Sequence, residues 1–174
     1  EEEPPSWLLN DASDGIISRV SNLKMIDELA SRGRPFIDLN DREIFPRCHT
    51  LTSDDHAIGS MAAEYLIERG QTHFGLCGFA GSHWSDARGD GCGKRLKLAG
   101  YKTAVLQTPD WETSIDVENQ TVQQIRQWLR RLERPIGIFA SNDRQAKLVL
   151  HACLQENAEI PDEISVLGVD DDDV

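Results

Sequence analysis

Long apolar runs are missing from this chain of 174 residues. Hydrophobic residues make up 39% of it, enough for a buried core, but no stretch approaches the roughly 18 apolar residues that a membrane-spanning helix needs. The first residues, Glu-Glu-Glu-Pro-Pro-Ser-Trp, contain neither the basic nor the apolar region of a secretion signal. These absences predict a cytoplasmic domain without a membrane segment.

Cysteine is scarce, and its spacing speaks against a metal site. The four cysteines form no Cys-x-x-Cys pair, and the five histidines show no His-x-x-x-His spacing. A zinc site therefore has no local signature. Cys77 and Cys153 lie in apolar stretches, where thiols act as small core side chains. This use of cysteine fits a reducing compartment.

Basic residues are too few for direct attraction to nucleic acid. The chain has 18 Lys and Arg against 30 Asp and Glu, a formal charge of −12, whereas DNA phosphates favour basic surfaces. Nucleotide-binding motifs are missing too. The loop 78–84 does not match Gly-x-Gly-x-x-Gly, and Gly93-Lys94 lacks the other residues of a P-loop. We expect no cofactor and no direct contact with DNA.

Short apolar runs alternate with amphipathic stretches, and this alternation predicts parallel sheets covered by helices. We expect an acidic, proline-containing tail at 1–13. The glycines at 89, 91 and 93 weigh against one of the helices. The expected strands are 14–19, 35–40, 48–52, 73–77, 101–106, 136–140 and 164–169, and the expected helices are 23–33, 53–70, 85–98, 122–134 and 142–153.

Polar residues follow the last two expected strands. Asn142 and Asp143 come after one of them, and Asp170 begins an acidic run after the other. Ligands of open α/β sheets bind outside such strand ends. Amide and carboxylate groups hydrogen bond to neutral hydroxyls, so a sugar fits. The alternative is that Asn142 or Asp143 caps a helix and that the aspartates form a solvated loop. That alternative suits Asp143 and Asp171 to Asp173 better than Asn142 and Asp170.

Four motifs occur together in the order of a known family. They are Asp55-His-x-Ile-Gly-x-x-Ala-Ala-x-Tyr-Leu-Ile-Glu-Arg-Gly, Ala87-Arg88-x-x-Gly91, Phe139-Ala-Ser-Asn142-Asp143 and Ile160-Pro-Asp-Glu-Ile-Ser-Val-Leu-Gly-Val-Asp170. Together they resemble the effector domain of lac-repressor-type regulators, which has the type I periplasmic sugar-binding fold. The resemblance extends over roughly residues 14–174 and is more specific than any one motif.

Three further segments are most similar to xylose-responsive regulators within that group. They are Asp14-Gly-Ile-Ile-Ser-Arg, Pro35-Phe-Ile-Asp-Leu and Pro135-Ile-Gly-Ile-Phe-Ala. Such regulators carry an AraC-type helix-turn-helix region after the sensor. The resemblance therefore implies a non-enzymatic domain that senses a pentose, with D-xylose the first candidate. It also implies a homodimer that contacts DNA only through a domain missing from this chain.

The resemblance implies ligand-binding roles for Arg88, Asn142 and Asp170. Arg88 would supply a rigid fork of donors opposite the acceptors of the other two, so that the three bracket adjacent hydroxyls. Asp143 belongs to the same Asn-Asp element and is included as a candidate. A surface role for Arg88 near a helix start is the alternative, although the helix dipole disfavours a cation there.

Two tryptophans are candidates for stacking on a sugar ring. Trp84 follows a glycine-containing loop, and Trp111 lies in a second loop. Aromatic faces pack well against the apolar face of a sugar, yet each residue could equally be a partly buried loop aromatic. Trp84 is included among the ligand-binding candidates.

The family resemblance divides the chain into two Rossmann-like α/β lobes with parallel sheets. Residues 1–52 would form an incomplete N-terminal lobe that lacks two strand-helix units, and 53–170 the C-terminal lobe. Residues 171–174 would begin the crossover back. The crossovers near 51–54 and near Asp170 would act as hinges. In the core, Cys92 replaces an aromatic residue that is usual after the glycine of Arg-x-x-Gly.

Two other functions stay open on the sequence. A transport receptor of the same fold would deliver sugar to a permease, but the missing leader and the unpaired cysteines count against it. An enzyme would need a catalytic centre, and Asp170 to Asp173 offer the oxygen ligands that Mg²⁺ or Ca²⁺ prefers. No histidine or phosphate loop accompanies that acidic run.

Overall fold

The computed structural model contains two compact units, residues 1–53 and 54–174. The residues that the structure describes are 14–19, 24, 27, 28, 31, 33, 35–39, 49–109 and 115–172. The expected tail at 1–13 and most of the expected helix at 23–33 lie outside them. Within the described part, no helix is both long and apolar enough to cross a membrane.

The first unit contains a small parallel sheet in the order β1-β2-β3. Its strands are β1 (Ile16–Ser18), β2 (Phe36–Asp38) and β3 (His49–Thr50). Phe36 and Asp38 are buried, whereas Ile37 between them is exposed, as the alternation of side chains along a strand requires. The three expected strands of this unit are confirmed, each shorter than expected.

The second unit is built on a four-stranded sheet with the order β5-β4-β6-β7. All neighbours in this sheet are parallel. The strands are β4 (Phe74–Phe79), β5 (Thr103–Thr108), β6 (Ile136–Ala140) and β7 (Ile164–Leu167). Every residue of β4 and β6 is buried, because these central strands are covered on both faces. The predicted α/β class with parallel sheets is therefore confirmed.

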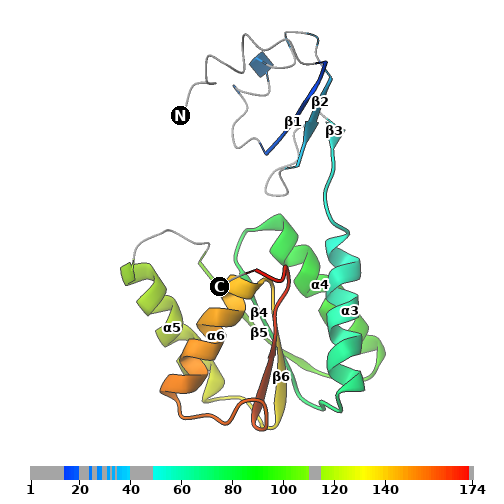
Figure 1. Cartoon of the computed structure of the whole chain (residues 1–174). Helices are drawn as coiled ribbons and strands as arrows, with labels where there is room; N and C mark the ends of the chain where they lie inside the picture. The colour runs from blue at the N-terminus through cyan, green and yellow to red at the C-terminus, as the bar shows by residue number, and fades with distance from the viewer. Residues whose placement is uncertain are drawn as a thin grey trace. The chain divides into compact units, whose positions relative to one another are not determined.

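Helices cover both faces of this sheet (Figure 1). One face carries α3 (Asp55–Glu68) and α4 (His83–Leu98), and the other carries α5 (Ile115–Leu129) and α6 (Asp143–Gln155). Each pair of helices closes its own apolar cluster against the sheet. The largest fully buried side chains of these clusters are Leu96, Ile125, Leu129, Ile138, Phe139 and Ile164.

Glycines bring α3 and α4 into close contact. A Cβ on Gly59 of α3 would lie 1.9 Å from the Arg88 carbonyl oxygen, and a Cβ on Gly91 of α4 would lie 2.2 Å from that of His56. Only glycine fits at both crossings, because anything larger would meet backbone. Gly91, one of the three glycines that weigh against a helix in isolation, is thus explained by helix packing. Cys92 beside them is fully buried in the core.

The helix ends follow capping chemistry. Asp54 caps α3 by accepting a hydrogen bond from the Ala57 N–H, and Gly70 follows the helix with a φ of +81°. The expected helix at 85–98 begins earlier, at His83, after Ser82. The expected strand 164–169 is wrong at its end, since β7 stops at Leu167 and Gly168 lies against α6.

Candidate functional site

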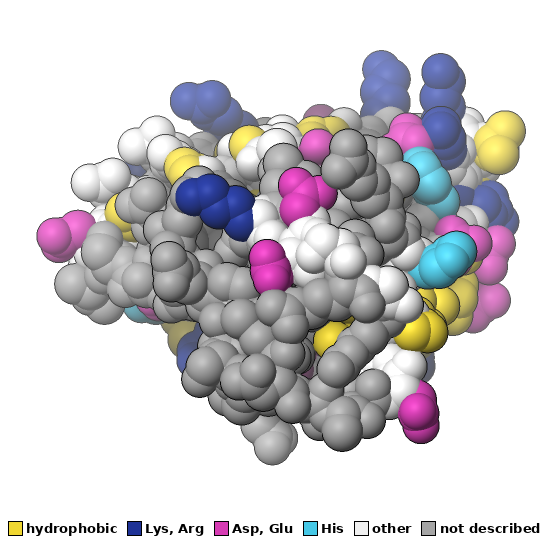
Figure 2. Space-filling model, turned by 90° about the horizontal axis from the view of Figure 1, so that it is seen from above, with side chains coloured by type: hydrophobic (Ala, Val, Ile, Leu, Met, Phe, Trp, Pro, Cys, Tyr) yellow, Lys and Arg dark blue, Asp and Glu magenta, His cyan; other side chains and the backbone are white. Residues whose placement is uncertain are grey.

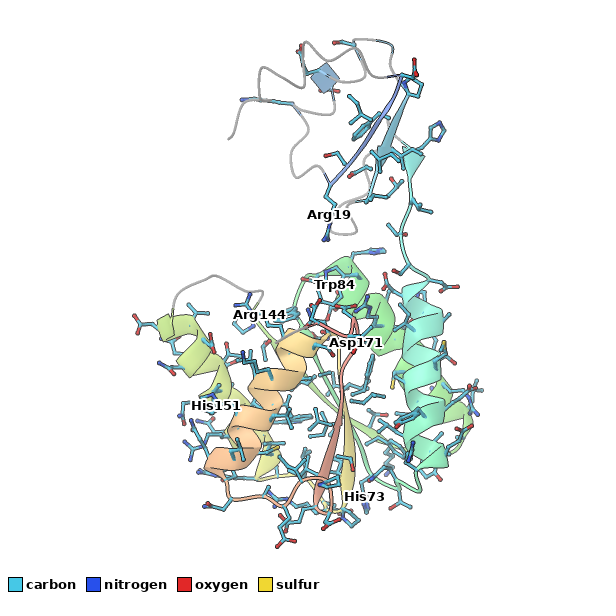
Figure 3. All side chains as sticks on the ribbon, in the orientation of Figure 1. Arg19, His73, Trp84, Arg144, His151 and Asp171 are labelled. Atoms are coloured by element: carbon cyan, nitrogen blue, oxygen red, sulfur yellow. The ribbon has the colours of Figure 1, made fainter. Side chains whose placement is uncertain are left out.

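The candidate residues gather where the strands of the second unit end. Trp84, Arg144 and Asp171 lie at this end of the sheet in Figure 3, and His73, which precedes β4, lies at the opposite end. The amino ends of α4 and α6 begin here as well, since each helix follows its strand directly. The expected meeting of polar side chains from different strand ends is present in the structure.

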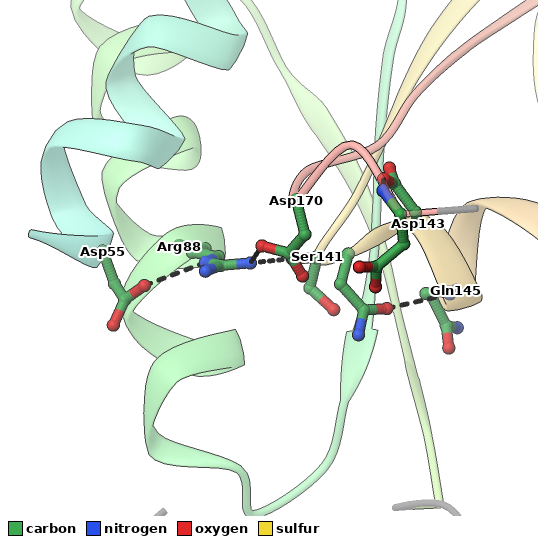
Figure 4. A network of polar contacts seen from close by, with 8 residues as sticks. Asp55, Arg88, Ser141, Asp143, Gln145 and Asp170 are labelled. Atoms are coloured by element: carbon green, nitrogen blue, oxygen red, sulfur yellow. Dashed lines mark hydrogen bonds and ion pairs between the residues drawn. The ribbon is translucent and has the colours of Figure 1, made fainter. Parts of the chain in front are cut away.

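Arg88 is the centre of the polar network in Figure 4. Its Nε donates to Asp55 Oδ1 at 2.9 Å, and its Nη1 donates to the Ser141 carbonyl oxygen at 2.8 Å. The same Nη1 lies 3.3 Å from Asp170 Oδ1. The Arg88 side chain is only 7% exposed. A buried guanidinium needs such partners, so Arg88 is held in one orientation.

The network leaves hydrogen-bonding groups available to a ligand. Among the described residues, no partner is found for Arg88 Nη2, whose two N–H groups are fixed by the plane of the guanidinium. Asp170 uses Oδ1 towards Arg88 and keeps Oδ2, and its side chain is 37% exposed. Donors and an acceptor therefore lie side by side, as adjacent hydroxyls of one ring would require.

Asp170 is held in an unusual backbone conformation. Its φ is +107° and that of Asp171 is +56°, so the chain turns sharply after β7. Partial burial raises the pKa of the Asp170 carboxyl, and Arg88 opposes this rise. The carboxylates of Asp172 and Asp143 raise that pKa further. Strained backbone and a shifted pKa are common at ligand sites.

Asn142 caps α6 and still has a donor to offer. Its Oδ1 accepts a hydrogen bond from the Gln145 N–H at 2.9 Å, from an extended backbone conformation. The capping role that the sequence left open thus falls to Asn142. The amide group Nδ2 has no partner in the described part of the chain, so capping and ligand binding are compatible. The residue's ligand role stays a prediction.

Asp143 ties the end of β7 to α6. Its N–H donates to the Val169 carbonyl oxygen at 2.9 Å, and its Oδ2 accepts from the Asp172 N–H at 2.9 Å. A Cβ on Gly168 would lie 2.1 Å from Asp143 Oδ1, so the loop passes directly over this carboxylate. These contacts give Asp143 a structural role in shaping the loop that carries Asp170.

Trp84 packs against the cation instead of standing alone in a loop. The Cζ atom of Arg88 lies 5.0 Å from the Trp84 ring centroid, which is cation–π geometry. Its ring also meets Phe79 edge-on, with centroids 5.9 Å apart. Trp84 therefore helps to position Arg88, and its stacking on a ligand stays a prediction. Trp111, the other stacking candidate, lies outside the described residues.

The sequence reasoning did not identify three polar residues of this network. Asp55 is the first residue of α3, Ser141 follows β6, and Gln145 is a fully buried residue of α6. Gln145 Nε2 reaches Cys77 Sγ at 2.9 Å. Burial raises the pKa of this thiol to about 12, against the smaller effect of the Gln145 contact. Asp55 and Ser141 each had a signal, as polar residues within matched motifs, whereas Gln145 had none.

A metal centre has no support in the described part of the second unit. No group of three or more His, Cys, Asp or Glu side chains gathers there in a way that would hold an ion. Asp170, which the enzyme alternative needs, faces Arg88 instead. The residues at the strand ends match the hydrogen-bonding pattern of a neutral polar ligand.

Comparison with known proteins places this geometry in a family. The xylose operon regulatory protein of Haemophilus influenzae is 26% identical over 168 residues, which cover 92% of this chain and 43% of that protein. The sucrose operon repressor of Streptococcus mutans is 31% identical over 157 residues, which cover 90% of this chain and 46% of the repressor. The chain thus spans less than half the length of these relatives.

A solved structure shows the same fold. The xylose-binding transcription activator xylR matches with a TM-score of 0.77 and 22% identity, covering 92% of this chain and 44% of that one. In addition, the family described as periplasmic binding protein-like domain matches residues 63–174, well over half of the sequence. The chain therefore belongs to the periplasmic binding protein-like domain family found in regulators of sugar operons.

Proposed function

We propose that this chain is the sugar-sensing domain of a bacterial transcription regulator and that its effector is a pentose, with D-xylose the first candidate. The observation that carries the proposal is the rigid pairing of Arg88 with Asp170. Two unused N–H groups of Arg88 lie beside a carboxylate that is 37% exposed. The Asn142 amide, from the next strand end, adds a third group with a free donor.

These groups suit a polyol chemically. A sugar hydroxyl accepts from Arg88 Nη2 or Asn142 Nδ2 and donates to Asp170 Oδ2, so each hydroxyl can use both of its capacities. Bonds to charged partners are stronger than neutral ones, about 1.5–3 kcal/mol each. The ligand remains uncharged, which fits a site whose own charges are already paired.

The relatives support the regulatory role. The two relatives described above are named as regulators of sugar operons, and one is named for xylose. We infer that DNA contact belongs to an AraC-type region outside this chain, because the chain itself carries a charge of −12. On the face seen in Figure 2, acidic and basic side chains of the described residues are interspersed. A homodimer and a cytoplasmic location complete this proposal.

Isothermal titration tests the sugar proposal. D-xylose is titrated into this chain and into the full-length gene product, with D-ribose, L-arabinose and D-glucose for comparison. We expect saturable binding of D-xylose, and at least about tenfold weaker binding of the other sugars. The absence of binding by every sugar to the full-length product would refute the proposal, and preference for another sugar would reassign the effector.

Two variants test the location of the site and leave Arg88, its buried cation, unchanged. Asn142→Ser keeps a good helix cap but loses the amide donor. Asp170→Asn keeps the shape of the side chain but loses the charged acceptor. Each should weaken D-xylose binding by about tenfold or more, whereas Lys147→Ala on exposed α6 surface should not change it. Unchanged binding in both site variants would place the ligand elsewhere.

A further inference from the structure

A second pocket lies between α4 and the sheet, on the side of the edge strand β5. Its volume is about 860 Å³, within the range of about 300–1,000 Å³ that small-molecule sites occupy. Arg88, Asn142 and Asp170 do not line this pocket, which shares only Ser141 with the polar network around Arg88. It is formed entirely by the second unit.

Two glycines keep the helix wall of this pocket open. Gly89 and Gly93 are one turn apart on α4, and both line the pocket. A Cβ on Gly89 would meet no atom within 4 Å, whereas a Cβ on Gly93 would lie 3.7 Å from Leu76 Cδ1 on the floor. A large side chain at position 89 would therefore occupy pocket space without displacing protein atoms.

The floor of the pocket is apolar. Leu76 and Phe139 line it, and both are almost closed to solvent. At the outer edge, Val105 of β5 is 57% exposed. Covering such surface is favourable by about 25 cal/mol for each Å² removed from water. Because so little of the floor is uncovered, a slender chain fits it better than a strand or a helix.

A buried hydroxyl without a partner lies at one end of the pocket, and two exposed lysines lie at the other. Ser141 lines it and is 3% exposed, and its Oγ has no hydrogen-bond partner among the described residues. Buried hydroxyls without a partner are rare in native proteins. At the other end, Lys97 and Lys102 line the pocket, and neither forms an ion pair within the described ranges. Lys94 nearby is different, because it pairs with Asp90.

The distance between these ends follows from the strand register. Cys77 is paired with both Leu106 and Ala140, so Ser141 is level with Gln107. Lys102 directly precedes Thr103 at the start of β5. Gln107 is about 13 Å further along β5 than Thr103, and Ser141 lies two strands across the sheet, so the backbones of the two ends are about 16 Å apart. The four-carbon stems of the lysines cover several Å of this distance, which leaves about 12 Å. A ligand that reaches both ends must have about this length.

We propose that this pocket binds a slender amphipathic carboxylate with a hydroxyl group at its far end. The apolar body lies on Leu76 and Phe139, and the hydroxyl hydrogen bonds with Ser141 Oγ. The carboxylate lies between Lys97 and Lys102. A chain of ten carbon atoms spans this length, so 10-hydroxydecanoate is a suitable probe. This proposal does not depend on the sugar-sensing function.

Nuclear magnetic resonance of the ¹⁵N-labelled chain tests the proposal. We expect 10-hydroxydecanoate, added below its aggregation range, to shift the amide signals of Gly89 and Gly93 saturably. The neutral probe 1,10-decanediol has the same body without the charge, and we expect it to bind at least about tenfold more weakly. D-xylose should leave the Gly93 signal unchanged, which separates this site from the proposed sugar site; Gly89 does not serve here because it directly follows Arg88.

Three variants decide whether the pocket itself holds the probe. Lys97→Ala combined with Lys102→Ala should reduce the preference for the anion over the diol to about twofold or less. Gly89→Leu should abolish binding of both probes. Its folding should not suffer, since leucine favours a helix by nearly 1 kcal/mol over glycine. Lys147→Ala, on the opposite face of the sheet, is the matched control and should bind like the unchanged chain.

Three results would overturn the proposal. One is binding that survives Gly89→Leu, and another is an equal affinity for the anion and the diol. The third is a set of shifts confined to the outer edge of β5, which would instead indicate that the strand pairs with an extended peptide.

Discussion

Arg88 Nε lies 2.9 Å from Asp55 Oδ1, which joins the second turn of α4 to the first residue of α3. The two residues are 33 positions apart, and both side chains are at most 10% exposed. The contact exists because Gly59 and Gly91 let the two helices approach closely. The orientation of the candidate ligand-binding arginine on α4 is therefore set in part by a contact with the neighbouring helix α3.

Removing Asp55 should destabilise the second unit strongly. Asp55→Ala leaves the buried Arg88 without its Nε partner, although Asp170 and the Ser141 carbonyl oxygen remain, and a buried donor without a partner costs about 1–3 kcal/mol. Urea unfolding followed by circular dichroism measures the loss. The control is Asp54→Ser, which removes the same charge one residue earlier but keeps a capping oxygen. Equal losses in the two variants would show that the ion pair contributes nothing specific.

The glycine crossing predicts opposite effects for two similar substitutions on neighbouring helices. Gly59→Ala places a Cβ 1.9 Å from a backbone oxygen, so the helices must separate, at a cost of about 1–3 kcal/mol or more. Gly89→Ala meets no atom within 4 Å and should stabilise α4 by about 1 kcal/mol. Thermal unfolding compares the two. If Gly59→Ala were as stable as the unchanged chain, the close packing of α3 and α4 would be wrong.

The contact between α5 and α6 should be sensitive to acid. Glu156, which directly follows α6, accepts hydrogen bonds from Arg126 of α5 and from Arg130, the residue after the end of α5. These bonds lower the pKa of Glu156 to about 2. A lowered carboxyl pKa stabilises the fold above the unfolded value of about 4.3, and this contribution is lost as the pH falls from there towards 2.

Glu156→Gln should therefore lower the melting temperature by a few degrees at neutral pH, and the difference should shrink as the pH falls through about 4. Calorimetry at several pH values measures it. Glu159→Gln changes an exposed carboxylate three residues later and should show little effect at any pH. A difference for Glu156→Gln that stayed constant down to about pH 2 would contradict the assigned ion pairs.

If Asp170 accepts a hydrogen bond from the sugar, the affinity should fall at a higher pH than it would for an aspartate with an ordinary pKa. Burial raises the pKa of Asp170 above the usual value of about 3.9. As the pH falls, the carboxylate gains a proton and stops accepting from the ligand at a pH above that value. Titrations between about pH 7.5 and about pH 4.5 should show falling affinity for the unchanged chain. Asp170→Asn should bind weakly at every pH, and a parallel decline in that variant would assign the effect to another group.

Much of the fold was predictable from local pattern. The alternation of apolar runs with amphipathic stretches predicted the parallel sheets, because strand and helix periodicities differ. It also predicted polar groups at the carboxyl ends of β6 and β7, since parallel strands bring these ends to one edge. The close packing of Gly91 against α3 was not predictable, because a glycine disfavours a helix and its use at a helix crossing becomes visible only when the neighbouring helix is in place.

The family resemblance alone pointed to Arg88, whereas the sequence pattern determined the fold class, the order of the elements and the meeting of Asn142 and Asp170 at neighbouring strand ends. These follow from spacing along the chain. Only the tertiary structure decided which groups remain available to a ligand. The Asn142 side-chain oxygen caps α6, the Asp143 carboxylate accepts from the Asp172 N–H, and Arg88 pairs with Asp55. The reason is physical, since a hydrogen bond joins atoms that folding brings together from distant positions, and their partners cannot be identified from either residue alone.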